Sequence, residues 1–191
     1  MRGGSGLLLL ILMLFGPSSG VAGVPLVLDR ERSEIEVEMR GTFGSFTGRL
    51  QAFEVAVSID PTGPTVERAE LEFKFADLRT GRPRRDRDML EWEDANHHPD
   101  VRFRLERLEV TPGVPARARG SLTLHRVEHN VVFPVTLLAD GAACSIDGEV
   151  NLDYRDYGLP VIRKFFMLKV DPHLRVRFHL QGRMETTAAL R

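Results

Sequence analysis

Apolar and polar residues alternate with a period of two along most of the chain, which is typical of β-strands with one dry and one wet face. The pattern is clearest in residues 34–40, where Ile35, Val37 and Met39 alternate with charged side chains. It recurs around these apolar residues: Phe53, Val55, Val57 and Ile59; Leu71, Phe73 and Phe75; Val101, Phe103 and Leu105; Leu122 and Leu124; Val131, Phe133 and Val135; Leu174, Val176, Phe178 and Leu180. About eight strands with turn signals between them predict one all-β domain, either a closed barrel or a sandwich.

One segment departs from this pattern. Residues 84–96 carry eight charged side chains and show no strand alternation. Met89, Leu90 and Trp92 would share one side of a short helix there, and Pro99 would stop the helix. We therefore predict a single short helix in a domain that is otherwise built from strands.

Residues 1–23 have the form of a secretory signal peptide, because Arg2 precedes an apolar run over residues 7–15 and small residues follow it. The run is shorter than the roughly 20 residues of a membrane-spanning helix, so an uncleaved anchor is the less favoured alternative. We expect cleavage near Ala22 or Gly23 and export of the mature protein. The barrel domain would then cover residues 24–182, and residues 183–191 would form a C-terminal tail.

Composition and motifs narrow the function. The chain has 26 basic and 27 acidic residues, which gives a net charge of −1 and disfavours nucleic acid as a partner. A single cysteine, Cys144, excludes an intrachain disulfide, and we expect it to be a buried, inert thiol. The chain has no nucleophile elbow, Walker loop or dinucleotide fingerprint. We therefore predict no catalytic residues and no cofactor, and we expect that the protein is not an enzyme.

The segment from His125 to His129 matches the H-x-x-E-H pattern of zinc peptidases, with Glu128 in the middle. That chemistry requires a helix, whereas the residues on both sides of the segment are typical of strands. The sequence therefore favours a hairpin turn at this point over a metal site. His97 and His98 precede a proline and are interpreted as polar loop residues, so no metal ligand is predicted.

The densest cationic cluster comprises Arg82, Arg84, Arg85 and Arg87. Guanidinium groups bind phosphate and carboxylate bidentately, so the cluster is a candidate site for an anionic head group. Ion pairing along a solvated helix is the favoured alternative, with these carboxylates as partners: Asp86, Asp88, Glu91 and Glu93.

Five segments, in the same order along the chain, resemble motifs of the YceI-like polyisoprenoid-binding family of exported bacterial proteins. The most specific is Gly-Ser-Leu-Thr-Leu-His-Arg-Val-Glu-His at residues 120–129, which continues into Phe-Pro-Val at residues 133–135 and is similar to the family's hairpin motif. The other four lie at residues 48–53, 80–89, 99–103 and 154–158. The resemblance covers about residues 27–182. Asp88 stands where the family commonly has histidine, and Arg126 stands where it commonly has glycine, so the head-group preference of this chain could differ.

The resemblance implies an eight-stranded antiparallel, lipocalin-like barrel with a short capping helix at one end. It also implies that the barrel lumen holds an isoprenoid lipid, such as a polyprenyl phosphate or a quinone, without catalysis. Arg85 would then lie near the head group, and the resemblance allows a homodimer and a membrane-associated donor or acceptor as partners. The residues that we predict to face the ligand in the lumen are Phe73, Phe75, Phe103, Leu124, Phe133 and Phe178.

Composition alone leaves the state of the lumen open. The phenylalanines could fill a solid core or line a cavity, because an eight-stranded barrel is about the size at which either outcome occurs. A filled barrel that acts as a structural or stress-related protein-interaction module is therefore the alternative to a lipid-binding protein.

Overall fold

The structure is a computed structural model, which describes residues 23–60, 62–63, 65–164 and 168–185. The predicted signal peptide, apart from Gly23, lies outside the described residues, and so do residues 186–191 of the predicted tail. The elements, in chain order, are β1 (Val24–Leu28), β2 (Glu34–Gly41), β3 (Gly44–Leu50), β4 (Glu54–Asp60), β5 (Thr65–Lys74), the short 3-10 helix η1 (Phe75–Asp77), β6 (Leu78–Arg79), α1 (Pro83–Glu93), β7 (Asp100–Glu109), β8 (Ala116–Leu124), β9 (Val127–Asp140), β10 (Ala143–Asp153), η2 (Tyr154–Tyr157), β11 (Arg163–Lys164) and β12 (Leu168–Met184).

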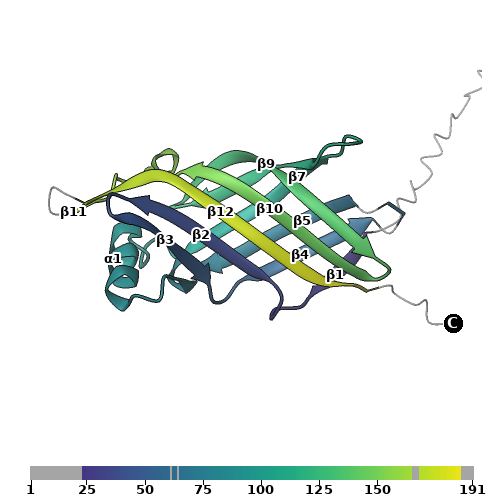
Figure 1. Ribbon diagram of the computed structural model, residues 1–191, viewed down its shortest axis with the longest axis horizontal. Coiled ribbons are helices and arrows are strands. Elements are labelled where there is room, and N and C mark those ends of the chain that lie inside the picture. Colours follow the sequence, from purple (N-terminus) through teal and green to yellow (C-terminus); the bar gives the residue numbers. More distant parts are fainter. Residues whose placement is uncertain (1–22, 61, 64, 165–167, 186–191) are drawn as a thin grey trace, which may run out of the picture.

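The strands form a closed antiparallel barrel (Figure 1). Closure comes from β1 and β12, where Leu26 lies opposite Met184 and Leu28 lies opposite Gly182. Three barrel strands are each broken into two halves, namely β1 with β2, β3 with β4, and β5 with β6. Together with β7, β8, β9, β10 and β12 they make eight strands among the described residues, which confirms the predicted architecture.

The three breaks lie side by side in the sheet, and hydrogen bonds tie them together. The backbone N–H of Gln51 donates to the carbonyl of Asp77 at 2.9 Å, between the break in the β3–β4 strand and η1. The Arg30 Nη1 donates to the carbonyl of Phe53 at 2.8 Å, between the first two breaks. These bonds satisfy backbone groups that the interrupted ladder leaves without strand partners, so the barrel wall stays continuous.

Alternation along each strand separates the two faces of the wall, as the sequence predicts. On β2, Ile35, Val37 and Met39 are buried inside the barrel. Glu36 lies on the outer face, where its Oε1 pairs with Arg49 Nε at 2.7 Å. An exposed ion pair contributes at most about 1 kcal/mol, whereas one buried aliphatic side chain contributes about 1.5–3 kcal/mol. The inner face therefore supplies most of the stabilisation.

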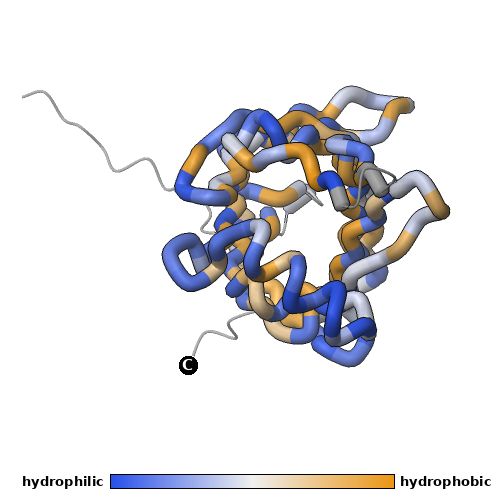
Figure 2. Tube along the Cα trace, turned by 90° about the vertical axis from the view of Figure 1, so that its left-hand side faces the viewer, coloured by the Kyte–Doolittle hydropathy of each residue, from blue (hydrophilic) through white to orange (hydrophobic). Residues whose placement is uncertain are grey.

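The helix α1 lies at one end of the barrel (Figures 1 and 2). It begins at Pro83, whose fixed φ suits a first helical position, and it ends at Glu93, after which Asp94 has a left-handed φ of 54°. The Trp92 Nε1 donates to the carbonyl of Pro160 at 2.8 Å, and the Trp92 ring meets the ring of Tyr154 edge-on at 5.0 Å. These contacts fix α1 on η2 and the segment that follows it. Among the described residues, no helix has both the length and the apolar character needed to cross a bilayer.

Three differences from the predicted strands concern Phe75, the strand β10 and the end of β12. Phe75 lies in η1 and not in a strand, because the chain breaks there before β6 pairs with β3. The strand β10 was not predicted, although Ile146 and its alternate neighbours face inward, because Gly148 interrupts the apolar pattern. The strand β12 extends to Met184, past the predicted start of the tail at residue 183, because Met184 pairs with Leu26 of β1.

Candidate functional site

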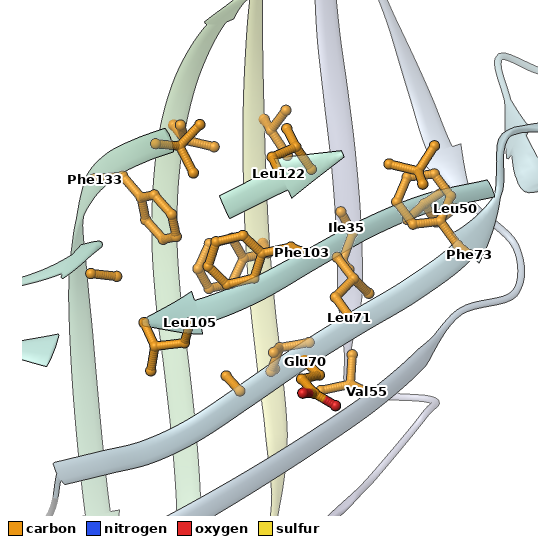
Figure 3. Close-up of a pocket in the computed structure, with 18 of the residues that line it drawn as sticks. Ile35, Leu50, Val55, Glu70, Leu71, Phe73, Phe103, Leu105, Leu122 and Phe133 are labelled. Carbon is orange, nitrogen blue, oxygen red and sulfur yellow. The ribbon is translucent and has the colours of Figure 1, made fainter. Parts of the chain in front are cut away.

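A cavity of about 190 Å³ lies inside the barrel, and strands from all sides of the wall line it (Figure 3). Among the described lining residues, Glu70 alone has a side chain that is not a hydrocarbon. Its Oε1 pairs with Arg104 Nε at 3.3 Å and with Arg68 Nη2 at 3.0 Å, and both arginines are exposed. The charge of Glu70 is therefore balanced on the outer face of β5, and the cavity surface is apolar.

The cavity occupies the middle of the barrel. On β12, Leu174, Val176 and Phe178 point inward but are only half-buried, whereas Val170 and Leu180 on either side of them are buried. The strand β5 and its continuation repeat this pattern: the half-buried residues are Leu71 and Phe73, and the buried ones are Val66 and Phe75. Inward side chains that lack close neighbours border an open space, so the barrel is packed near its ends and hollow between them.

All six residues that we predict for the lumen line this cavity: Phe73, Phe75, Phe103, Leu124, Phe133 and Phe178. Three of their rings form a connected group, because the centroid of Phe133 lies 5.7 Å from that of Phe103 and 5.9 Å from that of Phe178. Phe75, Leu124 and Phe133 are buried, while the other three are half-buried. The alternation thus identified the face that encloses the cavity, and contact with a ligand stays a prediction.

Arg85 lies on α1 and does not line the cavity. Its guanidinium carbon stacks over the ring of Phe46 in β3, 4.1 Å from the ring centroid. A role at a head group stays a prediction for this residue. Ion pairing of Arg82, Arg84, Arg85 and Arg87 along the helix also stays a prediction.

A second group of polar residues lies beneath the cap, at the end of α1. Glu93 is fully buried, and in the described part of the chain neither of its carboxylate oxygens has a hydrogen-bond partner. His125 Nδ1 lies 3.4 Å from Glu93 Oε1 and donates to the backbone carbonyl of Glu93 at 3.1 Å. Burial raises the pKa of Glu93 to about 7, against the opposing charge of His125. This acid therefore changes its charge near neutral pH.

His98 completes this group, which we call the cap cluster: Glu93, His98 and His125. The ring centroids of His98 and His125 are 4.1 Å apart, and His98 Nδ1 is buried with no partner among the described residues. Burial, followed by the charge of His125, lowers the pKa of His98. Sequence analysis did not single out this cluster. Glu93 lies in a helix with many charged residues, and His125, which contacts it, is 32 residues further along the chain.

The H-x-x-E-H segment forms the β8–β9 turn, as predicted. His125 and Arg126 have φ values of 51° and 59°, which are those of a tight hairpin turn with two left-handed residues. Glu128 and His129 follow in β9 and are both exposed, and the ring of His129 contacts that of Tyr157 at 5.3 Å. In the described ranges, no group of three or more His, Cys, Asp or Glu residues is arranged to hold a metal ion.

Cys144 lies in β10 and is buried, as expected. Burial raises the pKa of its thiol above the ordinary value. A thiol in these surroundings stays protonated at neutral pH and is a poor nucleophile.

Comparison with known proteins places this barrel among relatives. The family model described as the YceI-like domain matches residues 26–182. None of the curated proteins matches the sequence significantly.

Several solved structures share the fold. BcnA of Burkholderia cenocepacia superposes with a TM-score of 0.72 at 19% identity, over 82% of this chain and 99% of that one. The YCEI protein of Campylobacter jejuni has a TM-score of 0.64 at 14% identity, over 73% of this chain and 85% of that one. A polyisoprenoid binding domain from Saccharophagus degradans, implicated in plant cell wall breakdown, has a TM-score of 0.61 at 14% identity, over 85% of this chain and 99% of that one. At these identities the likeness establishes the fold.

Proposed function

The chain belongs to the family of YceI-like domains, and we propose that it is a non-catalytic binding or carrier protein for an isoprenoid-type lipid. The hydrocarbon chain of a polyprenyl phosphate or a quinone would occupy the lumen. The single observation that carries the proposal is the hollow, apolar middle of the barrel. The polyisoprenoid binding domain with the same fold supports the choice of ligand class.

The energetics favour such a ligand. Burial of a methylene-sized group contributes about 0.8 kcal/mol, so one five-carbon isoprene unit contributes about 3–4 kcal/mol. Association costs about 4–15 kcal/mol in lost freedom of motion, and a few enclosed units offset this cost. A cavity of about 150 Å³ already accepts a molecule as large as benzene. The lumen, at about 190 Å³, therefore has room for part of such a chain without rearrangement.

The lining also restricts where a head group can lie. A phosphate needs charge-assisted hydrogen bonds when it leaves water, and the hydrocarbon lining offers none. We infer that the tail is enclosed and that a charged head group stays outside the middle of the lumen. Among the described lining residues Glu70 is the one acid, and its carboxylate is paired with arginines on the outer face, which supports binding without catalysis.

Native mass spectrometry of the purified protein, with and without an added polyprenol, tests the proposal. We expect a population with the added mass of one polyprenol, which organic extraction of the protein then releases. An unliganded mass in both samples, together with no uptake of a labelled polyprenol, would exclude the carrier function and leave a structural or interaction module.

We further propose that the protein acts in the periplasm after cleavage of its signal peptide. The charged first residues, the apolar run and the small residues up to Gly23 support this location. N-terminal sequencing of the protein from a periplasmic extract should find a first residue close to position 23. Recovery of the intact chain from the cytoplasm would contradict it.

A further inference from the structure

Two glycines of the barrel wall face the lumen, and a phenylalanine ring lies against each of them. A Cβ atom built on Gly148 of β10 would lie 2.3 Å from Cζ of Phe178. A Cβ atom built on Gly120 of β8 would lie 2.7 Å from Cε2 of Phe103. A Cβ atom does not approach a non-bonded atom this closely, so each ring occupies the space that a side chain at the glycine position would need. Neither glycine has a positive φ, so the requirement is for space.

The phenylalanines and glycines alternate across five neighbouring strands. We call this set the lumen belt, and it comprises Phe103 on β7, Gly120 on β8, Phe133 on β9, Gly148 on β10 and Phe178 on β12. Successive rings are 5.7 Å and 5.9 Å apart, which is within the range of favourable aromatic contact. Because the glycines let the outer two rings lie close to the wall, the middle of the lumen is wider than these side chains would otherwise allow.

We propose that the lumen belt determines which hydrocarbon chains enter, and that Gly148 and Phe178 form its specificity-determining pair. This inference rests on the proposed function. An isoprenoid chain has a methyl branch on every fourth carbon of its backbone and is therefore thicker than an unbranched chain of equal length. The belt admits the branched chain because Phe178 lies against Gly148, and its ring faces supply contacts for the methyl groups.

Gly148 is the better position for a test than Gly120. The nearest atoms to a new Cβ at Gly148 belong to the Phe178 ring, which can move into the open lumen. At Gly120 the new Cβ would also lie 2.3 Å from the backbone carbonyl oxygen of Arg104, so the β7–β8 pairing would have to shift. Gly148→Ala therefore narrows the lumen at little cost to the fold. Gly63→Ala is the matched control, because Gly63 has no positive φ and its Cβ would meet open space.

Binding of two probes to these variants tests the belt: a polyprenol and an unbranched alcohol with the same number of carbon atoms in its backbone. We expect Gly148→Ala to weaken polyprenol binding by at least about tenfold and alcohol binding by less than about threefold, because one methyl group in an apolar pocket changes affinity on this scale. Gly63→Ala should change neither. Phe178→Leu in the Gly148→Ala background should restore polyprenol binding, because leucine leaves room for the new methyl group.

The outcomes separate the two proposals. If the unaltered protein binds neither probe, the proposed function fails and the belt has no role. If the unaltered protein binds polyprenol but Gly148→Ala weakens both probes equally, or if Phe178→Leu does not restore binding, the belt proposal fails and the proposed function stands. Should Gly148→Ala not fold, Phe178→Leu alone must shift the ratio of the two affinities toward the branched chain, and an unchanged ratio overturns the belt proposal.

Discussion

The lumen and the cap cluster are both enclosed by the fold, yet their contents are opposite. The lumen is hollow and its surface is hydrocarbon, whereas the space beneath α1 is filled and holds a buried carboxylate with two histidines. At about 24 cal/mol per Å³, a hydrocarbon chain that fills an apolar volume of about 190 Å³ contributes about 5 kcal/mol. A buried polar group without a partner costs about 1–3 kcal/mol. The two regions are therefore stabilised by different species: a hydrocarbon chain in the lumen and a proton in the cap cluster.

The substitution with the largest expected effect places a charge in the lumen. Phe103→Arg would place a guanidinium among hydrocarbon side chains, between Gly120 and Phe133. Glu70, the one carboxylate among the described lining residues, is already paired with Arg68 and Arg104 on the outer face. We expect a loss of more than about 4 kcal/mol in the free energy of unfolding, or no folding at all, and no lipid binding. Urea denaturation and polyprenol uptake measure the two effects.

Glu72→Arg is the control on the opposite face of the wall. Glu72 is exposed and pairs with Arg102 at 3.3 Å, so its replacement removes a single surface ion pair and should cost less than about 1 kcal/mol. Lipid binding should be unchanged. Equal losses from Phe103→Arg and Glu72→Arg would show that the assignment of the two faces is wrong.

Filling the lumen should have the next largest effect. A polyprenol present at about 100 times its dissociation constant should stabilise the protein by about 2.7 kcal/mol. For a domain of this size, that corresponds to a rise in Tm of about 5–10 °C. Differential scanning calorimetry measures the shift, and glycerol at equal concentration is the control. A Tm that does not respond to polyprenol would mean that the cavity is not a site for it.

The cap cluster should make the stability of the protein depend on pH, and Glu93 sets the direction of this dependence. Its pKa is raised from 4.5 to about 7, so its contribution to stability is complete below pH 4.5 and is lost as the pH rises through 7. The lowered pKa of His98 acts in the opposite sense, because its contribution is lost as the pH falls below 6.5. Asp94 and His125 also act on Glu93, so a variant must isolate the Glu93 effect.

Glu93→Gln isolates the effect of Glu93 ionisation on stability, because glutamine keeps the shape of the side chain and does not titrate. We expect the unaltered protein to lose about 2–3 kcal/mol relative to Glu93→Gln between pH 5 and pH 8. Urea denaturation of both proteins at the two pH values gives the difference. Parallel stability curves would show that Glu93 does not titrate in this range, and the cap cluster would then differ from the lumen only in composition.

The two regions also differ in how far the sequence reveals them. The face of the lumen could be predicted because each strand carries its own alternation, and Phe103 or Phe178 points inward whatever the rest of the barrel does. The size of the cavity could not, because it depends on how rings from β7, β9 and β12 meet in space. The alternation did not reveal β10, because Gly148 interrupts its apolar residues. The same glycine leaves the space that the Phe178 ring occupies.

The cap cluster carries no comparable local signal. Glu93 resembles its charged neighbours in α1, and its burial depends on the β8–β9 turn, which brings His125 to it. The turn itself was predictable, because the residues on either side of it are typical of strands. Its contact with the end of α1 was not, because that contact is set by the packing of the helix on the barrel.

Arg85 offers the smallest effect, and it tests whether the cap takes part in ligand binding. Its guanidinium stacks on Phe46, 4.1 Å from the ring centroid. Because the hydrocarbon lining of the lumen offers no partner to a phosphate, a cation at the cap is the side chain that suits a charged head group.

Arg85→Gln should cost less than about 1 kcal/mol in stability, which is the usual worth of an exposed cation–π contact. It should weaken binding of a polyprenyl phosphate by about 5–10-fold and leave the uncharged polyprenol within about twofold. A parallel titration of the two lipids against both proteins measures this. Equal weakening of both lipids would show that Arg85 acts through packing on Phe46, and the lumen alone would then account for binding.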